Sequence, residues 1–327
     1  MREYRQGAGT MKEITIQDMR KVRVGQAEDK DAGTGCTVIL CREGAVAGVD
    51  VRGGGPATRE TDLLNPINMV EKIHAVCLSG GSAYGLDAAG GVMQYLEEHE
   101  IGFDMKVARI PIVCGASLFD LSVGNPHVRP DKEMGYQACV NSELPGFEEG
   151  NHGAGTGASV GKMIGFEHAM KSGIGTYGVE LDGIQVVAIV AVNACGNVVD
   201  FETNELLAGM LDKETNTILK AEDVLEQAHK AEPLGNTTIG CIITNAKLSK
   251  AQCTKVAGIS HNGYARAIQP VHTMSDGDTI FVLSTQEIDC DADTVGILAV
   301  HCMGKAINRA VCKAKGAYGL KAYCDIK

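Results

Sequence analysis

The sequence has 327 residues, 44% of them apolar, and its 30 basic and 41 acidic side chains give a formal charge of −11. This balance argues against nucleic acid as the main partner, because phosphate binding requires a basic face. No apolar run reaches the about 18 residues of a membrane span, and the charged first residues lack the apolar stretch of a signal peptide.

Strands are predicted where apolar and β-branched residues cluster between turn residues. Several of these runs are continuous rather than alternating, for example IQVVAIVAVN at 184–193. Continuous apolar runs are typical of strands that are covered on both faces. In chain order, the predicted strands span 36–42, 45–51, 73–78, 184–193, 237–245 and 279–284.

Three helices are predicted between these strands. The first spans 83–97. The second begins at the capping-box pattern SKAQ, with Ser249 as its N-cap, and continues toward Arg266. The third follows Asp291, where apolar residues recur at helical spacing. Helices and strands therefore interleave along the chain, which indicates an α/β fold.

Two segments differ in composition from the rest. Residues 204–235 are polar and charged, and we interpret them as a mobile, helix-prone linker that ends just before the strand at Thr237. Residues 1–10 are interpreted as a tag or an extended N-terminus, because Met11 is also a possible start.

Several ligand motifs are approached but not completed. GAGTGASVGKM resembles a phosphate-binding loop, but Thr156 stands where the pattern needs glycine, and Met163 replaces the magnesium-binding hydroxyl. DCDADT resembles a calcium loop but has Thr294 and Val300 at its sixth and twelfth positions. The nine histidines show no paired spacing, so we expect no metal site. The twelve cysteines form no CxxC pair, and we expect most to be reduced and buried in a cytoplasmic protein.

The turn SGGSAYG, which contains Ser82, follows a predicted strand and precedes a predicted helix. A nucleophile elbow would need glycine at Tyr84, so the pattern is incomplete. A Ser82 nucleophile would also need a histidine and an acid that the sequence does not single out. We therefore interpret the turn as a pocket lining with N–H groups at a helix N-terminus, with a plain strand-to-helix turn as the alternative.

The segment LGNTTIGCIITNA places a polar corner, Asn236-Thr237, at the mouth of an apolar strand. Gly-Asn is turn chemistry and threonine suits a strand start, so an ordinary turn explains the residues equally well. Spacing alone does not separate that interpretation from a functional one.

The chain resembles peptidase family S58, the DmpA-like N-terminal-nucleophile hydrolases of the P1 peptidase family. That family includes β-aminopeptidases, L-aminopeptidase/D-esterases, a pantetheine amide hydrolase and nylon-oligomer hydrolases. The resemblance begins near Met11 and covers nearly all of the chain that follows. It rests on ordered motifs, namely RGGGPATRETDLL, LSGGSAYGLDAA, GAGTGASVGK, VAVNACGNV, GNTTIG and SDGDTIF.

This resemblance implies an αββα sandwich, in which two packed sheets are flanked by helices, as a single domain over 1–327. It also implies self-cleavage between Asn236 and Thr237, giving chains 1–236 and 237–327. The two chains are expected to stay together in a homo-tetramer of αβ units. The implied activity is hydrolysis of small peptides or amino-acid amides, without a metal or an organic cofactor.

The resemblance also implies roles for individual residues. Thr237 would be the nucleophile, and its freed amine, with a pKa of about 7.7–8.0, would act as the base. Asn193 matches the oxyanion-binding asparagine, and an amide that closes an apolar strand is otherwise unusual. Asp276 and Asp278 match paired acids that orient the nucleophile, and Lys162 matches a lysine beside it.

Three other residues are placed in the substrate pocket: Ser82, Tyr84 and Phe119. Phe119 departs from relatives that carry tyrosine there, so it has no hydroxyl to donate to an oxyanion. Two alternatives remain open: a serine hydrolase that uses Ser82 without self-cleavage, and a non-catalytic protein of the same fold that binds small molecules. The sequence does not identify the natural substrate.

Overall fold

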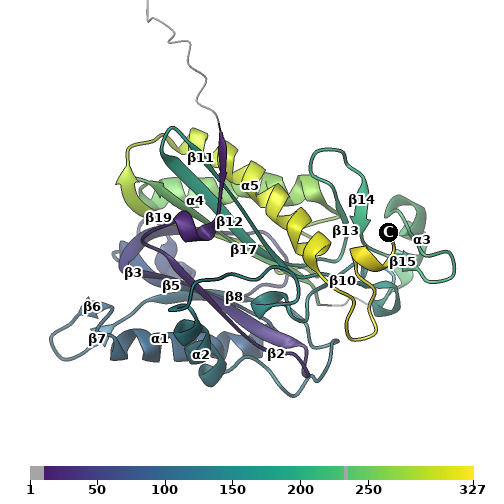
Figure 1. The fold of residues 1–327 in the computed structure, drawn as a ribbon, viewed down its shortest axis with the longest axis horizontal. Coiled ribbons are helices and arrows are strands. Elements are labelled where there is room, and N and C mark those ends of the chain that lie inside the picture. Colours follow the sequence, from purple (N-terminus) through teal and green to yellow (C-terminus); the bar gives the residue numbers. More distant parts are fainter. Residues whose placement is uncertain (1–10, 232–234) are drawn as a thin grey trace, which may run out of the picture.

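A computed structural model of the protein describes residues 11–231 and 235–327. The interpretation of residues 1–10 as a tag or extension lies outside these described ranges. Within them, the chain forms an αββα sandwich, with α4 and α5 on one side and α1 and α2 on the other (Figure 1). The fold class expected from the sequence is confirmed.

The two sheet halves are joined by hydrogen bonding into one path of strands, in the order β1-β11-β12-β17-β19-β3-β5-β8-β4, with β2 paired to β3. All neighbouring pairs are antiparallel except β17–β19 and β5–β8, which are parallel. The bounds are β1 Lys12–Ile14, β2 Arg23–Asp29, β3 Thr34–Val51, β4 Ala57–Arg59, β5 Lys72–Ser79, β8 Val113–Ser117, β11 Ile174–Leu181, β12 Ile184–Asn193, β17 Thr237–Ala246 and β19 Thr279–Ile288.

The long strand β3 connects the halves. Its first part, from Thr34 to Leu40, pairs with β2, and its last part, from Val46 to Val51, pairs with β19. The pairing of β3 with β5 shifts register between Leu40 and Ala45. The sequence predicts two separate strands here, at 36–42 and 45–51. They form one continuous strand that belongs to both halves of the sandwich.

Three apolar cores separate the four layers. Along β12 the side chains alternate between two of them. Even-numbered residues from Val186 to Val192 pack with α4 and α5, and odd-numbered residues from Val187 to Ala191 pack against the other sheet half. The third core lies between that other half and helices α1 and α2. The continuous apolar run of β12 is therefore explained by cover on both faces, as predicted.

The helices are α1 (Ala88–Glu98), α2 (Lys132–Asn141), α3 (Leu225–Lys230), α4 (Lys250–Ala267) and α5 (Ala292–Lys313). The capping box at Ser249 is present, and the Asp291 side chain caps α5. The helix predicted over 83–97 begins instead as a 3-10 helix, Ser82–Asp87, before α1. Helix α5 is long and apolar enough to cross a membrane, but 67% of its apolar window is buried in the fold, as in a core helix.

The described part of the segment 204–235 is not the simple linker that its polar composition suggests; residues 232–234 of this predicted linker lie outside the described ranges. It contains short strands and the one-and-a-half-turn helix α3, and its apolar residues Leu207, Ala208 and Leu211 are buried. The remaining short strands are β6 Phe103–Asp104, β7 Arg109–Ile110, β9 Ser159–Val160, β10 Met170–Lys171, β13 Asn197–Val199, β14 Leu206–Ala208, β15 Leu211–Asp212, β16 Thr217–Ile218 and β18 Ile268–Gln269.

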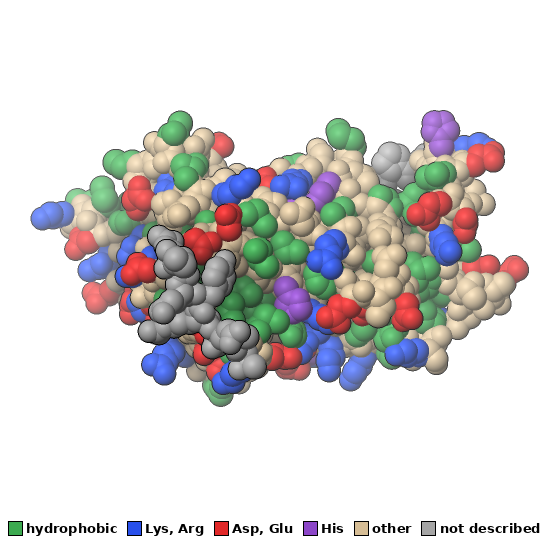
Figure 2. All heavy atoms as spheres, turned by 90° about the horizontal axis from the view of Figure 1, so that it is seen from above, with side chains coloured by type: hydrophobic (Ala, Val, Ile, Leu, Met, Phe, Trp, Pro, Cys, Tyr) green, Lys and Arg blue, Asp and Glu red, His purple; other side chains and the backbone are tan. Residues whose placement is uncertain are grey.

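Charges of both signs are interspersed on the face seen in Figure 2. That face therefore does not form the continuous basic surface that a phosphate backbone requires. Burial of most cysteines is confirmed, since Cys36, Cys77, Cys241 and others lie in the cores.

Lys171 on β10 is a buried cation inside this framework. Its Nζ donates hydrogen bonds to the carbonyl oxygens of Gly155, Ala158 and Ser172 at 3.2, 2.9 and 2.5 Å. Burial lowers the pKa of Lys171 to about 7, against the opposing charge of Asp120. The side chain thereby ties the Gly-rich segment 153–162 to β10.

Lys171→Met should destabilise the fold by about 3 kcal/mol, because it removes three hydrogen bonds to buried carbonyl groups. Urea denaturation measures this change. The exposed Lys321→Met is the matched control and should stay within about 0.5 kcal/mol of the parent. Equal stability of the two variants would contradict the structural role of Lys171.

Candidate active site

The register between two buried strands brings Asn193 and Thr237 together. In the antiparallel pair of β12 and β17, Val186 lies opposite Thr244 and Asn193 lies opposite Thr237. A slip by one residue would move every apolar side chain to the wrong core, so the register is strongly specified. Asn193 is fully buried and Thr237 is 3% exposed, at the same edge of the sheet.

The peptide bond between Asn236 and Thr237 is enclosed at the mouth of β17. Asn236 is 2% exposed, and its N–H donates to the Ser275 carbonyl oxygen at 3.0 Å. The Thr237 hydroxyl donates to the carbonyl oxygen of Asn236. The predicted nucleophile therefore lies directly against the carbonyl group of the predicted scissile bond.

Asn193 is held at both ends of its amide. Its Oδ1 accepts from the Ser159 N–H at 3.0 Å and from Lys162 Nζ at 2.9 Å, and its Nδ2 donates to the Phe119 carbonyl oxygen at 2.8 Å. Because Oδ1 faces two donors, these contacts fix the side of the amide that carries the N–H groups. Burial lowers the pKa of Lys162 to about 7, although the charge of Asp276 opposes the shift.

The Gly-rich segment 153–162 places Lys162 next to Asn193. Its glycines allow close backbone packing: a Cβ on Gly155 would lie 2.2 Å from the Ile174 nitrogen. Gly161 has a φ of +76°, which suits glycine and turns the chain just before Lys162. This motif packs tightly against neighbouring backbone, unlike the open loop that cradles a phosphate.

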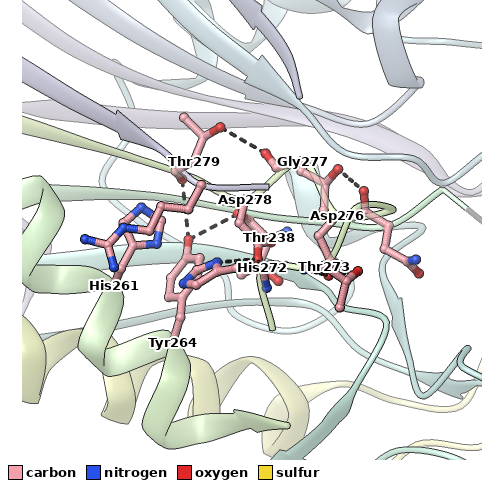
Figure 3. Close-up of polar contacts among 12 residues, drawn as sticks. Thr238, His261, Tyr264, His272, Thr273, Asp276, Gly277, Asp278 and Thr279 are labelled. Atoms are coloured by element: carbon pink, nitrogen blue, oxygen red, sulfur yellow. Dashed lines mark hydrogen bonds and ion pairs between the residues drawn. The ribbon is translucent and has the colours of Figure 1, made fainter. Parts of the chain in front are cut away.

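Asp276 and Asp278 lie in the turn before β19 (Figure 3). Asp278 Oδ1 accepts from the Thr238 N–H at 2.8 Å. Asp276 Oδ2 accepts from the N–H and hydroxyl of Thr273 at 2.9 and 2.6 Å. Burial, with the nearby charge of Asp278, raises the pKa of Asp276. The two carboxylates thus fix the turn and the start of β17 relative to each other.

Gly277, between these two acids, touches the candidate nucleophile. A Cβ placed on Gly277 would lie 2.6 Å from Thr237 Oγ and 2.9 Å from the Gly55 carbonyl oxygen. The glycine in Asp-Gly-Asp is therefore required by space beside the hydroxyl. The sequence alone suggests only an Asp-Gly turn at this position.

His272, His261 and Tyr264 support Asp278 and were not singled out from the sequence (Figure 3). Asp278 Oδ2 accepts from the His272 N–H at 3.0 Å and lies 2.8 Å from its Nδ1. The ring of His272 meets that of His261 edge to face at 4.7 Å, and the Tyr264 hydroxyl donates to the Thr238 carbonyl oxygen at 3.3 Å. Burial lowers the pKa of His261 to about 4. The available signal was the three-residue spacing of His261 and Tyr264 on one helix face.

Asp120 is a second buried carboxylate that sequence reasoning missed. It accepts from the Gly81 N–H and from the Thr34 hydroxyl, both at 2.7 Å, and burial raises its pKa to about 6. Because it follows Phe119, it ties the SGGSAYG turn to the residue whose carbonyl holds Asn193. The apolar stretch around 113–120 concealed it.

The two residues that the sequence places in the pocket from that turn have different surroundings. The Ser82 N–H donates to the Leu118 carbonyl oxygen at 2.9 Å, and within the described ranges its hydroxyl has no histidine partner. Tyr84 is 61% exposed, with the Arg129 guanidinium 3.8 Å above its ring. The structure thus joins Thr237, Asn193, Lys162, Asp276, Asp278 and Phe119 in one network. Ser82 is connected to that network through backbone contacts, its own N–H with Leu118 and the N–H of Gly81 with Asp120.

The described part of the chain contains no group of three or more His, Cys, Asp or Glu side chains arranged to hold a metal ion. The site brings together a hydroxyl, an amide, an amine with a lowered pKa and two carboxylates.

Comparison with protein families gives a match to peptidase family S58 over residues 15–323. An uncharacterized aminopeptidase of Mycobacterium leprae is 41% identical over 95% of this chain and 94% of its own length. A 6-aminohexanoate-oligomer endohydrolase of Paenarthrobacter ureafaciens is 34% identical over 86% of this chain and 77% of its own.

Solved structures are similar in fold at low sequence identity. A β-aminopeptidase of Burkholderia sp. superposes with a TM-score of 0.67 at 21% identity, covering 98% of this chain and 95% of its own. The L-aminopeptidase D-Ala-esterase/amidase of Ochrobactrum anthropi has a TM-score of 0.71 at 18% identity, covering 94% and 88% of the two chains.

Gly277→Ala should displace the Thr237 hydroxyl, because the added methyl group would stand 2.6 Å from it. A displacement near 1 Å lowers the rate of a positioned reaction by about 100-fold. We expect that loss in the hydrolysis of a small amide, with the circular dichroism spectrum unchanged.

Gly55→Ala is the matched control, because a Cβ there would meet its nearest atoms at ordinary contact distances of 3.6 and 3.8 Å. It should keep its activity within about threefold of the parent, as expected of a substitution that makes no clash. Equal activity of Gly277→Ala and Gly55→Ala would show that the space beside Thr237 does not matter.

Proposed function

We propose, because this chain belongs to peptidase family S58, that it hydrolyses amide bonds through Thr237 after cutting its own backbone between Asn236 and Thr237. The family assignment makes the protein an aminopeptidase or amidohydrolase. The observation that carries the finer proposal is the contact of the Thr237 hydroxyl with the carbonyl of Asn236. That contact lies within the Asn193, Lys162 and Asp276–Asp278 network.

Self-cleavage begins with attack of Thr237 Oγ on the Asn236 carbonyl carbon. A threonine hydroxyl is a weak nucleophile, so a base has to remove its proton. Lys162 is the proposed base, because its Nζ lies 2.9 Å from Oδ1 of Asn193, the residue paired with Thr237, and burial lowers its pKa to about 7. The protonated base then gives its proton to the Thr237 nitrogen as the C–N bond breaks. The acyl group stays on Oγ as an ester, and water hydrolyses that ester to the Asn236 carboxylate.

The released amine of Thr237 then serves the second reaction. An α-amino group has a pKa of about 7.7–8.0, so it can take the proton of its own hydroxyl during attack on a substrate amide. Asp278 holds the backbone of Thr238, and Asp276 lies two residues away in the same turn. These acids orient the chain end, and the raised pKa of Asp276 limits the negative charge beside the amine.

Asn193 is the proposed oxyanion donor. One N–H of its Nδ2 is used by the Phe119 carbonyl oxygen, and the second is available to an oxyanion at Thr237. Such a donor is typically worth about 3 kcal/mol of barrier. Phe119 contributes no hydroxyl, so the charged form of Lys162 is the other candidate to stabilise the oxyanion.

The proposed substrates are small peptides or amino-acid amides. Relatives are named for aminopeptidase activity and for endohydrolysis of 6-aminohexanoate oligomers. We further propose that chains 1–236 and 237–327 stay together as a cytoplasmic homo-tetramer of αβ units. No cofactor enters the proposed chemistry.

Thr237→Ala should block both self-cleavage and hydrolysis, because it removes the hydroxyl that both reactions use. Thr237→Ser keeps a hydroxyl and should still be cleaved. Intact mass on purified protein, followed by sequencing of the new N-terminus, distinguishes these results. The native product should begin with TTIGCII.

Two controls accompany this test. Thr238→Val removes a neighbouring buried hydroxyl that has no partner in the structure and should leave cleavage in place. Ser82→Ala should also leave it in place. An active native enzyme that remains one full-length chain, or a Thr237→Ala variant that retains activity while Ser82→Ala loses it, would move the reaction to Ser82.

Self-cleavage should accelerate as pH rises through about 7 and then level off. The pKa of Lys162 is lowered from 10.5 to about 7 by burial, so its neutral, basic form predominates above that pH. A precursor prepared at low pH and shifted to a series of higher pH values gives the rate profile. Lys162→Arg should be slower by at least about 100-fold, because its guanidinium stays charged throughout. A native rate that is flat from acid to neutral pH would exclude Lys162 as the base.

A further inference from the structure

Asn236, the residue before Thr237, is bound through two hydrogen bonds to Ser275. The Asn236 N–H donates to the Ser275 carbonyl oxygen at 3.0 Å, and its Nδ2 donates to Ser275 Oγ at 3.3 Å. Ser275 Oγ in turn lies 3.1 Å from Thr273 Oγ1, and the Thr273 hydroxyl donates a hydrogen bond to Asp276 Oδ2. The backbone and the side chain of Asn236 are therefore both recognised by one residue that is fixed to the acidic turn.

The residue before that one, Gly235, lies against the ring of Phe119. A Cβ on Gly235 would stand 2.6 Å from Phe119 Cγ and 3.0 Å from Phe119 Cβ. The space left by the Phe119 ring therefore favours glycine at this position. The backbone carbonyl of Phe119 is held by Asn193, which anchors this wall to the residue opposite Thr237.

The two reactions in the proposed function pass through the same kind of intermediate. In self-cleavage, the Asn236 carbonyl carbon bonds to Thr237 Oγ while its bond to the Thr237 nitrogen breaks, which leaves an ester beside a free amine. In turnover, a substrate carbonyl carbon bonds to the same Oγ while its own amine leaves. Water hydrolyses both esters. A substrate acyl group in that ester therefore takes the place that Asn236 and Gly235 hold in the uncleaved chain.

We propose that Ser275 and Phe119 form the acyl-binding subsite of the mature enzyme. The subsite selects an acyl residue with a small hydrogen-bonding side chain, such as asparagine, preceded by an unbranched glycyl or methylene unit. The Ser275 carbonyl binds the acyl residue's nitrogen, Ser275 Oγ binds its side chain, and the Phe119 ring excludes a branch at the unit before it. This inference rests on the proposed function, because it assumes the Thr237 ester.

The first test compares rates of self-cleavage in precursors made by cell-free synthesis, followed on denaturing gels after translation is stopped. Asn236→Ala loses one side-chain hydrogen bond and should be slowed about fivefold. Gly235→Ala should be slowed by at least about tenfold through its clash with Phe119. Adding Phe119→Ala to Gly235→Ala should restore the rate to within about threefold of Phe119→Ala alone, as expected of two residues in direct contact.

The second test measures kcat/KM of the mature enzyme with three anilides: glycyl-asparaginyl, glycyl-leucyl and alanyl-asparaginyl. The first should exceed each of the others by about tenfold, from the lost hydrogen bond in one case and the clash in the other. Phe119→Ala should raise the ratio of alanyl-asparaginyl to glycyl-asparaginyl hydrolysis by about tenfold. Ser275→Ala should reduce the preference for asparaginyl over leucyl substrates by about fivefold.

The possible outcomes distinguish failure of the acyl-binding subsite from failure of the proposed Thr237 mechanism. A native chain that remains intact overturns the Thr237 mechanism itself. A chain that cleaves itself but hydrolyses none of the anilides, or whose anilide preference does not follow the order of the self-cleavage series, overturns the subsite alone. Failure of Phe119→Ala to relax either the Gly235→Ala defect or the glycyl preference also overturns it.

Discussion

The antiparallel register of β12 and β17 is the constraint on which the site depends. Each of these strands lies between two apolar cores, and alternate side chains belong to different cores. A shift by one residue would reverse both faces at once, at a cost of many buried side chains. The pairing of Asn193 with Thr237 is therefore set by the packing of residues several positions away. The hydroxyl proposed as the nucleophile is thus positioned by the sheet itself and not by a loop that must first become ordered.

The polar groups of the site are confined to the ends of these strands, where buried charges have to be compensated. Lys162 meets the amide and carbonyl oxygens of Asn193, and Asp278 meets a backbone N–H and His272. Two further buried charges stabilise the surrounding backbone: Lys171 holds the Gly-rich segment 153–162, and Asp120 holds the SGGSAYG turn. Desolvation without a directly bonded counter-charge explains how Lys162 acquires a pKa of about 7. Burial of this lysine is thus the physical basis of its proposed role as a base.

Much of the sheet was predictable because periodicity and apolar runs report burial on one or both faces. The strands at 184–193 and 237–245 were located to within a residue, whereas β3 was divided in two because Glu43 and Gly44 interrupt its apolar pattern. The site residues Thr237, Asn193, Lys162, Asp276 and Asp278 came from motif resemblance, and the structure brings them into one network. Asp120, His272 and Ser275 were missed, because their contacts with Thr34, Asp278 and Asn236 follow neither the helical nor the strand period. Such contacts leave no local pattern.

Phe119 bears on the difference between the two reactions proposed for Thr237. Self-cleavage occurs once in each molecule, so a slow rate suffices, whereas turnover repeats the same acyl transfer with every substrate. In the proposed mechanism, an oxyanion site that has Asn193 but no tyrosine hydroxyl at 119 lacks the stabilisation of one donor, which is worth about 3 kcal/mol. That deficit is tolerable for the single event but limits turnover directly. In this proposal the ring of Phe119 acts by filling space beside Gly235 and not by stabilising the oxyanion. It therefore favours substrates whose acyl group fits the subsite, because that fit, and not an additional hydrogen-bond donor, raises the rate.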